Sequence, residues 1–120
     1  MLLRTALALV LAGLAAGCGS TSVPSVEDAV RSYSGAFLAG QGEKAAAMLS
    51  TRCDAPALRQ QIVLASKAAP ALYGQARIVS VAPTVDGDHA TVTYRFDQPA
   101  IDQEDQPWVY ESGAWRYDKC

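Results

Sequence analysis

Residues 89–96 read HATVTYRF, and this stretch decides the fold class. From Ala90 to Phe96, apolar and polar side chains alternate, which is the pattern of a strand with one buried and one solvated face. Asp86-Gly87-Asp88, just before it, is a turn signal, and residues 75–85 before that turn are rich in strand-forming residues. The stretch therefore predicts the second strand of an antiparallel hairpin.

The sequence that follows predicts two more strands. Residues 97–106 contain Pro99 and several acidic side chains, which indicates an irregular acidic loop. Residues 108–111 and 114–118 are rich in aromatic side chains and flank Ser112-Gly113, a hairpin turn. We expect a meander of four antiparallel strands.

The sequence before residue 75 has the period of helices instead. We predict a first helix from Ser25 to the glycine-rich segment 40–42, a second over 43–49, and a third over 56–69, ended by Pro70. Helices first and strands afterwards predict an α+β fold, with the helices packed on one face of a curved antiparallel sheet.

The first 18 residues read MLLRTALALVLAGLAAGC. Arg4 precedes an uncharged apolar run, residues 5–16, which is too short to cross a membrane and is typical of a signal peptide. The run ends in LAAGC, residues 14–18, which resembles the bacterial lipobox, with Ala15 where Leu is usual. The resemblance implies cleavage before Cys18 and acylation of its thiol.

We therefore predict three parts: a lipoprotein signal peptide at residues 1–17, a lipidated tether at 18–24, and one domain at 25–120. Two or more acyl chains on Cys18 would anchor the protein stably to the outer face of the cell membrane. The alternative is a plain secreted protein in which Cys18 has no special role.

Export also bears on the other two cysteines, Cys53 and Cys120, because disulfides persist outside the cytosol. They are not in a CxxC pair. The chain has a single histidine, His89, which together with these cysteines does not supply the ligands and spacing of a zinc site. We predict a Cys53–Cys120 disulfide; a free, reactive Cys53 is the alternative.

Several local patterns occur together in one order. They are Val30-Arg31-x-Tyr33 in the first helix, residues 45–49 before the Cys53 loop, the hairpin at 85–92, and the ending Trp108-x4-Gly113-x-Trp115-Arg116-x-Asp118-x-Cys120. In this order, from about Val23 to Cys120, the chain resembles the NTF2-like (cystatin-like α+β) superfamily. That resemblance implies a cone whose curved sheet encloses a cavity. Many members have a short strand between the second and third helices, and the sequence predicts none here.

The net charge and the sequence motifs argue against several classes of function. A net charge of −2 and a pI near 5.2 argue against binding nucleic acid. His89 lies beside a turn, and no nucleophile motif accompanies it. The acidic residues of the loop lack the spacing of a calcium site; they are Asp97, Asp102, Glu104 and Asp105. We predict no catalytic residue, no metal site and no cofactor.

Aromatic side chains are the candidates for a binding pocket. Most of them belong to the core, but a tyrosine that lines a cavity offers an apolar ring with a polar tip. We select Tyr33, Tyr94 and Tyr110 as possible pocket-lining residues.

The functional hypothesis is a non-catalytic, membrane-anchored binding module for a small apolar ligand or an envelope protein. The alternative is a cavity enzyme of the isomerase or cyclase type, in which a tyrosine acts with an Asp or with His89. A purely structural envelope component is a third possibility. A homodimer is a further expectation, because dimers are frequent in the superfamily that the chain resembles.

Overall fold

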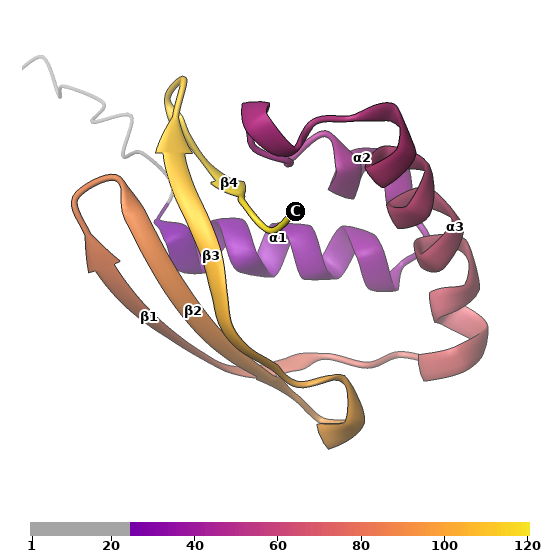
Figure 1. Cartoon of the computed structure of the whole chain (residues 1–120). Coiled ribbons are helices and arrows are strands. Elements are labelled where there is room, and N and C mark those ends of the chain that lie inside the picture. The colour runs from indigo at the N-terminus through magenta and orange to yellow at the C-terminus, as the bar shows by residue number, and fades with distance from the viewer. Residues whose placement is uncertain (1–24) are drawn as a thin grey trace, which may run out of the picture.

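The computed structural model describes residues 25–120, in which helices come first and strands follow (Figure 1). Helix α1 (Val26–Leu38) begins as predicted, because the Oγ of Ser25 accepts a hydrogen bond from the backbone N–H of Asp28 at 3.1 Å. Its buried face includes Val30 and Tyr33, at the spacing of one helix side. The predicted signal peptide and the Cys18 site lie outside the described residues.

Helix α2 (Gly42–Ala46) is shorter than predicted and α3 (Pro56–Tyr73) is longer. After α2 the chain turns tightly, and Leu49 pairs with Tyr117 rather than continuing the helix. Pro70 does not end α3. Proline removes only one backbone N–H from the ladder, and the helix continues for another turn to Gly74.

Helices α2 and α3 meet at the backbone of Gly42. A Cβ atom on Gly42 would lie 2.6 Å from the Cα of Val63 and 2.9 Å from the Cβ of Ser66. Any side chain at position 42 would therefore force the two helices apart. The hydroxyl of Ser66, itself fully buried, donates to the backbone carbonyl of Phe37 at 2.7 Å and joins α3 to the end of α1.

The sheet is an antiparallel meander in the order β1-β2-β3-β4. The strands are β1 (Ile78–Asp86), β2 (His89–Phe96), β3 (Gln103–Glu111) and β4 (Ala114–Tyr117). The α+β prediction is confirmed, and Figure 1 shows the helices on one side of the curved sheet. Irregularities in register within β1 and between β2 and β3 accompany this curvature.

The predicted loop over 97–106 is partly wrong. Only residues 97–102 are outside the sheet, with a 3₁₀ turn at Pro99–Ile101, and β3 already begins at Gln103. The carboxylate of Asp102 accepts a hydrogen bond from the backbone N–H of Phe96 at 2.8 Å and closes this connection. The polar side chains at 104 and 105 are exposed, so the strand has no apolar alternation at its start.

The core lies between α1 and the sheet. Trp108, Val30 and Val92 are at most 1% exposed. The rings of Trp108, Tyr33 and Tyr117 form a triangle with centroids 4.8 to 5.9 Å apart. This aromatic cluster joins β3 and β4 to the middle of α1.

Residues 48–53 and 116–120 lie side by side, and we call this pairing the C-terminal clamp. The backbone N–H of Tyr117 donates to the carbonyl of Met48, and the N–H of Ser50 donates to the carbonyl of Tyr117, both at 2.8 Å. The predicted disulfide is present, with the Cα atoms of Cys53 and Cys120 5.5 Å apart.

Asp118 is the polar centre of the clamp. Its Oδ1 accepts hydrogen bonds from the Ser50 hydroxyl and from the Nε of Arg52, each at 2.6 Å, and the side chain of Asp118 is only 11% exposed. Burial alone would raise the pKa of the Asp118 carboxyl. The hydrogen bonds from Arg52 and Ser50 and the arginine's charge outweigh it and hold that pKa below its usual value.

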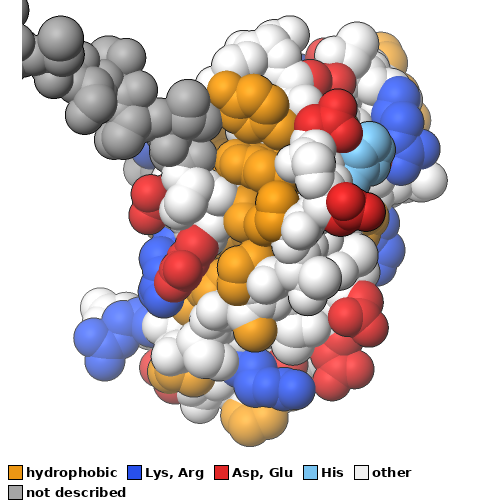
Figure 2. Space-filling view, turned by 90° about the vertical axis from the view of Figure 1, so that its left-hand side faces the viewer, with side chains coloured by type: hydrophobic (Ala, Val, Ile, Leu, Met, Phe, Trp, Pro, Cys, Tyr) orange, Lys and Arg blue, Asp and Glu red, His pale blue; other side chains and the backbone are white. Residues whose placement is uncertain are grey.

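Strand β1 is an edge strand with apolar side chains in solvent. Val79 and Val85 are 62% and 52% exposed. Figure 2 shows this side of the molecule, with hydrophobic side chains in a continuous column flanked by charged ones. Pro83, in the middle of β1, lacks the N–H that a further strand would need. None of the helices formed by residues 25–120 is long and apolar enough to span a bilayer.

Candidate functional site

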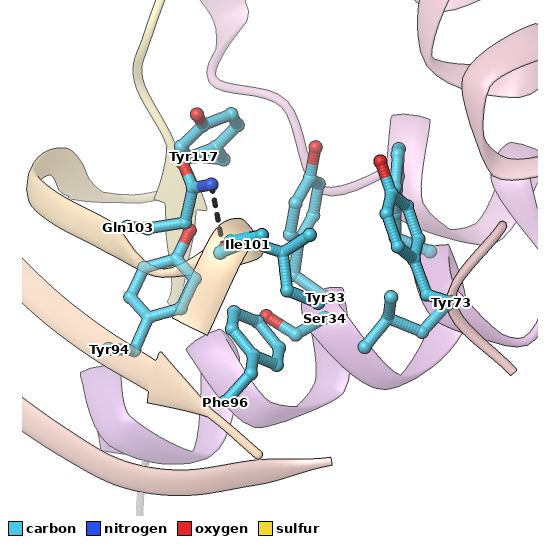
Figure 3. Close-up of a pocket in the computed structure, with 11 residues that line it drawn as sticks. Tyr33, Ser34, Tyr73, Tyr94, Phe96, Ile101, Gln103 and Tyr117 are labelled. Carbon is cyan, nitrogen blue, oxygen red and sulfur yellow. Dashed lines mark hydrogen bonds between the residues drawn. The ribbon is translucent and has the colours of Figure 1, made fainter. Parts of the chain in front are cut away.

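A pocket of about 370 Å³ opens between α1, the end of α3 and the sheet (Figure 3). Its walls come from five parts of the fold: Tyr33, Ser34, Phe37 and Leu38 of α1, Tyr73 of α3, Tyr94 and Phe96 of β2, Ala100, Ile101 and Gln103 around the start of β3, and Tyr117 of β4. Figure 3 shows the labelled side chains converging on this hollow from helix and sheet. Its size is within the range of small-molecule sites.

The spacing of aromatic residues along β2 and α1 explains why their rings lie on the same side of each element and line the pocket. Tyr94 and Phe96 are two residues apart on β2, so they point to the same face of the sheet, and their rings are 5.9 Å apart. Tyr33 and Phe37 are one helical turn apart on α1, with rings 6.4 Å apart. The pocket is therefore bounded by aromatic faces on both sides.

Three of the pocket tyrosines, Tyr33, Tyr94 and Tyr117, keep neutral hydroxyls over the physiological range. Burial, with a smaller contribution from neighbouring tyrosines, raises the pKa of Tyr33 and of Tyr94 far above the ordinary value. Burial also raises the pKa of Tyr117 to about 12, and its hydroxyl donates to the Oε1 of Gln106 at 3.0 Å. These hydroxyls offer hydrogen bonds to a ligand, but no charge.

None of the described residues that line the pocket is an Asp, Glu, His, Lys, Arg or Cys. The polar groups present are the tyrosine hydroxyls, the Ser34 hydroxyl and the Gln103 amide, whose Nε2 donates to the carbonyl of Ile101 at 3.1 Å. These walls can hold an apolar molecule and hydrogen-bond one or two of its uncharged oxygens. Among the described residues, these walls include no carboxylate and no imidazole, which are the side chains that most often act as general acid or base.

The structure brings two of the three selected tyrosines together. Tyr33 and Tyr94 line the pocket, and Tyr110 does not. Tyr110 lies at the far end of β3, where its N–H donates to the carbonyl of Asp88 and its ring packs on Trp115 at 5.5 Å. Tyr110 is not among the residues that line this pocket, because the pocket lies at the other end of β3, where Tyr94 pairs with Gln103.

Sequence reasoning missed Tyr73 and Tyr117 as pocket residues. The prediction ended α3 at residue 69, which left Tyr73 outside any element. Tyr117 pairs with Trp108 across β3 and β4, so it shares the inner face of the sheet with that buried ring. The register between β3 and β4, which sets Tyr117 opposite Trp108, is the signal that could have identified Tyr117 as an inward-facing residue.

The other candidate groups lie elsewhere. The side chain of His89 is 69% exposed, and its Nδ1 is 2.7 Å from the Oδ1 of Asp88. Arg95 pairs with Asp102 at 3.3 Å and with Glu104 at 3.6 Å on the surface. Among residues 25–120, no three His, Cys, Asp or Glu side chains are arranged to hold a metal ion.

Comparisons with protein-family models, with curated proteins and with solved structures give no match.

Proposed function

We propose that this protein is an exported, membrane-anchored lipoprotein whose domain binds a small, largely apolar ligand in the aromatic pocket. The composition of the pocket walls carries this proposal. Aromatic rings and neutral hydroxyls suit a ligand with an apolar body and few polar atoms. The protein holds such a ligand rather than transforms it.

The same walls distinguish binding from the enzymatic alternative. An isomerase or cyclase of the predicted type needs a carboxylate or imidazole within hydrogen-bond reach of the reacting atoms. The pocket has tyrosines but neither of those groups, and His89 is exposed on another part of the surface. This arrangement favours the binding module.

An NTF2-like architecture is part of the proposal. Its support is the order of elements, with helices followed by a four-stranded antiparallel meander, and the pocket between helix and sheet. The single parallel bridge between Leu49 and Tyr117 gives further support, because Leu49 lies between the second and third helices. It stands where many members of that superfamily have a short strand.

The pocket can be tested by closing it. Ala100 is exposed and lines the pocket, so Ala100→Trp places a large ring in the hollow without entering the core. We expect the affinity for N-phenyl-1-naphthylamine, an uncharged fluorescent probe, to fall about tenfold or more. Titration of the chain carrying Cys18→Ser, which has no acyl chain of its own to compete, measures this.

Ala68→Trp is the matched control, because Ala68 is exposed on α3 and does not line the pocket. Equal probe affinity in the two tryptophan variants would contradict the proposal. A wild-type chain that does not bind the probe at all would contradict it as well.

The anchor is tested separately at Cys18. Cys18→Ser removes the only thiol available for a thioether at the predicted lipobox, so we expect the protein to lose its acyl chains and to leave the membrane fraction. Intact mass and labelling with a palmitate analogue measure the acylation. A Cys18→Ser protein that still carries the label would contradict the lipoprotein assignment, and Cys53→Ser is the control that should keep it.

An envelope protein is the second kind of partner that we propose. Val79 and Val85 of the edge strand β1 lie in solvent, and Figure 2 shows a column of hydrophobic side chains on one face of the molecule. A second copy of the chain is the other occupant that would fit the expectation of a homodimer. Sedimentation of the purified chain distinguishes the two, because only self-association changes the mass of the isolated protein.

A further inference from the structure

A second hollow, of about 230 Å³, adjoins the aromatic pocket on the side of α1 where β1 begins. Ser34 and Leu38 line both hollows, so the two share a wall. A ligand longer than the aromatic pocket would have to pass Ser34 and Leu38 to reach the second hollow.

The two hollows differ in charge. The aromatic pocket has no charged wall, whereas Arg31 and Arg77 both line the second hollow. Arg31 pairs with Glu27 at 3.4 Å, but both side chains are nearly half exposed, so that pair is weak. Arg77 makes no ion pair with any other residue in the part of the chain that the structure describes. Because two arginine side chains line this one hollow, an anion bound there would be attracted by both.

Backbone hydrogen bonds fix the position of Arg77 beside the second hollow. The N–H of Arg77 donates to the Oδ1 of Asp97, and the N–H of Asp97 donates to the carbonyl of Arg77, both at 3.0 Å. Gly35 also lines the second hollow, and a Cβ atom at this position would meet no atom within 4 Å. The missing side chain of Gly35 thus leaves open space in the second hollow.

We propose that the ligand is an anionic amphiphile with one hydrocarbon chain and a carboxylate head, as in a fatty acid; this inference rests on the binding function proposed above. The chain occupies the aromatic pocket and the carboxylate lies between Arg31 and Arg77. A carboxylate inside the uncharged pocket would be desolvated without a partner, which is costly. A guanidinium offers two parallel N–H groups that match a carboxylate.

The volume of the aromatic pocket limits the length of the hydrocarbon chain that the pocket can hold. A pocket of about 370 Å³ holds roughly a dozen groups the size of a water molecule, at about 30 Å³ each. A hydrocarbon chain of around ten carbons fits that space.

The test compares decanoate with 1-decanol, which have the same chain and differ in the charge of the head. Each compound is titrated at neutral pH into the Cys18→Ser protein loaded with N-phenyl-1-naphthylamine, and the displacement of the probe is measured. We expect decanoate to displace the probe at about a tenfold lower concentration than decanol, and we expect this preference to shrink as salt is raised.

Two variants locate the head group. Arg31→Gln combined with Arg77→Gln should remove the preference for decanoate and leave decanol unchanged, whereas Arg59→Gln, an exposed arginine of α3 outside both hollows, should keep it. Gly35→Leu fills the second hollow without a clash at its Cβ, and it should reduce the preference by itself. Circular dichroism checks that each variant is folded.

The outcomes separate this inference from the function on which it rests. If decanol and decanoate displace the probe equally from the wild-type chain, or if the arginine variant keeps the preference, the head-group site is wrong and the apolar pocket stands. If neither compound nor the probe binds, the proposed function fails and this inference fails with it.

Discussion

Reduction of the Cys53–Cys120 disulfide lowers the free energy of unfolding by about 4 kcal/mol. The two cysteines are 67 residues apart in sequence, and closing a loop of that length removes much of the entropy of the unfolded chain. Domains of this size are stable by only about 5–15 kcal/mol. A large share of the margin that keeps residues 25–120 folded therefore depends on this one bond.

Urea denaturation of the oxidised and reduced forms of one protein, the chain carrying Cys18→Ser, measures this difference. The sequence is identical in both forms, so the comparison isolates the bond. Cys53→Ala combined with Cys120→Ala should resemble the reduced form. Equal stability of the oxidised and reduced proteins would show that the cross-link has no such role.

Asp118→Asn destabilises the domain by about 2 kcal/mol at neutral pH, because the carboxylate accepts charge-assisted hydrogen bonds from Ser50 and Arg52. The Ser50 bond is fully buried and contributes the larger part, since Arg52 is 62% exposed and screened by water. Urea denaturation of the wild-type protein and of the variant, under the same conditions, measures the loss.

The pH dependence of this effect follows from the lowered pKa of the native Asp118 carboxyl. Because the unfolded chain binds that proton more readily, the stabilisation is complete above the ordinary Asp pKa of about 4 and is lost as pH falls through the lower native value. The difference between wild type and Asp118→Asn should be constant above about pH 5 and should shrink in acid. Asp54→Asn is the control, because Asp54 and its partner Arg59 are both exposed; it should change stability very little at any pH.

The fold class and most elements could be predicted from local sequence. The alternation over 89–96 gave the bounds of β2 as the structure has them, and Ser25 marked the start of α1. The errors share one cause, which is that tertiary contacts overrode a local signal. Pro70 lies inside α3, and polar residues begin β3, because packing and pairing with β2 hold those segments in place.

The position of the pocket could be predicted less well from the sequence than the fold could. Periodicity showed that Tyr33 and Tyr94 face inward, but it could not show at which end of the sheet the hollow lies. Tyr110 has the same parity as the buried Trp108 and still lies outside, because the pocket is near the pairing of Tyr94 with Gln103. That information lies in the register between strands, which no single strand contains.

The contact at Gly42 has a consequence for evolutionary divergence. The residues that line a binding pocket can be substituted as the ligand changes, and exposed residues can be substituted with little effect. The backbone of Gly42, in contrast, is packed against Val63 and Ser66 and leaves no room for a side chain. In remote homologues that keep this helix pair, we expect a glycine at the equivalent of position 42 after most of the tyrosines have been exchanged. That glycine, more than the aromatic residues, is the marker by which such proteins would be recognised.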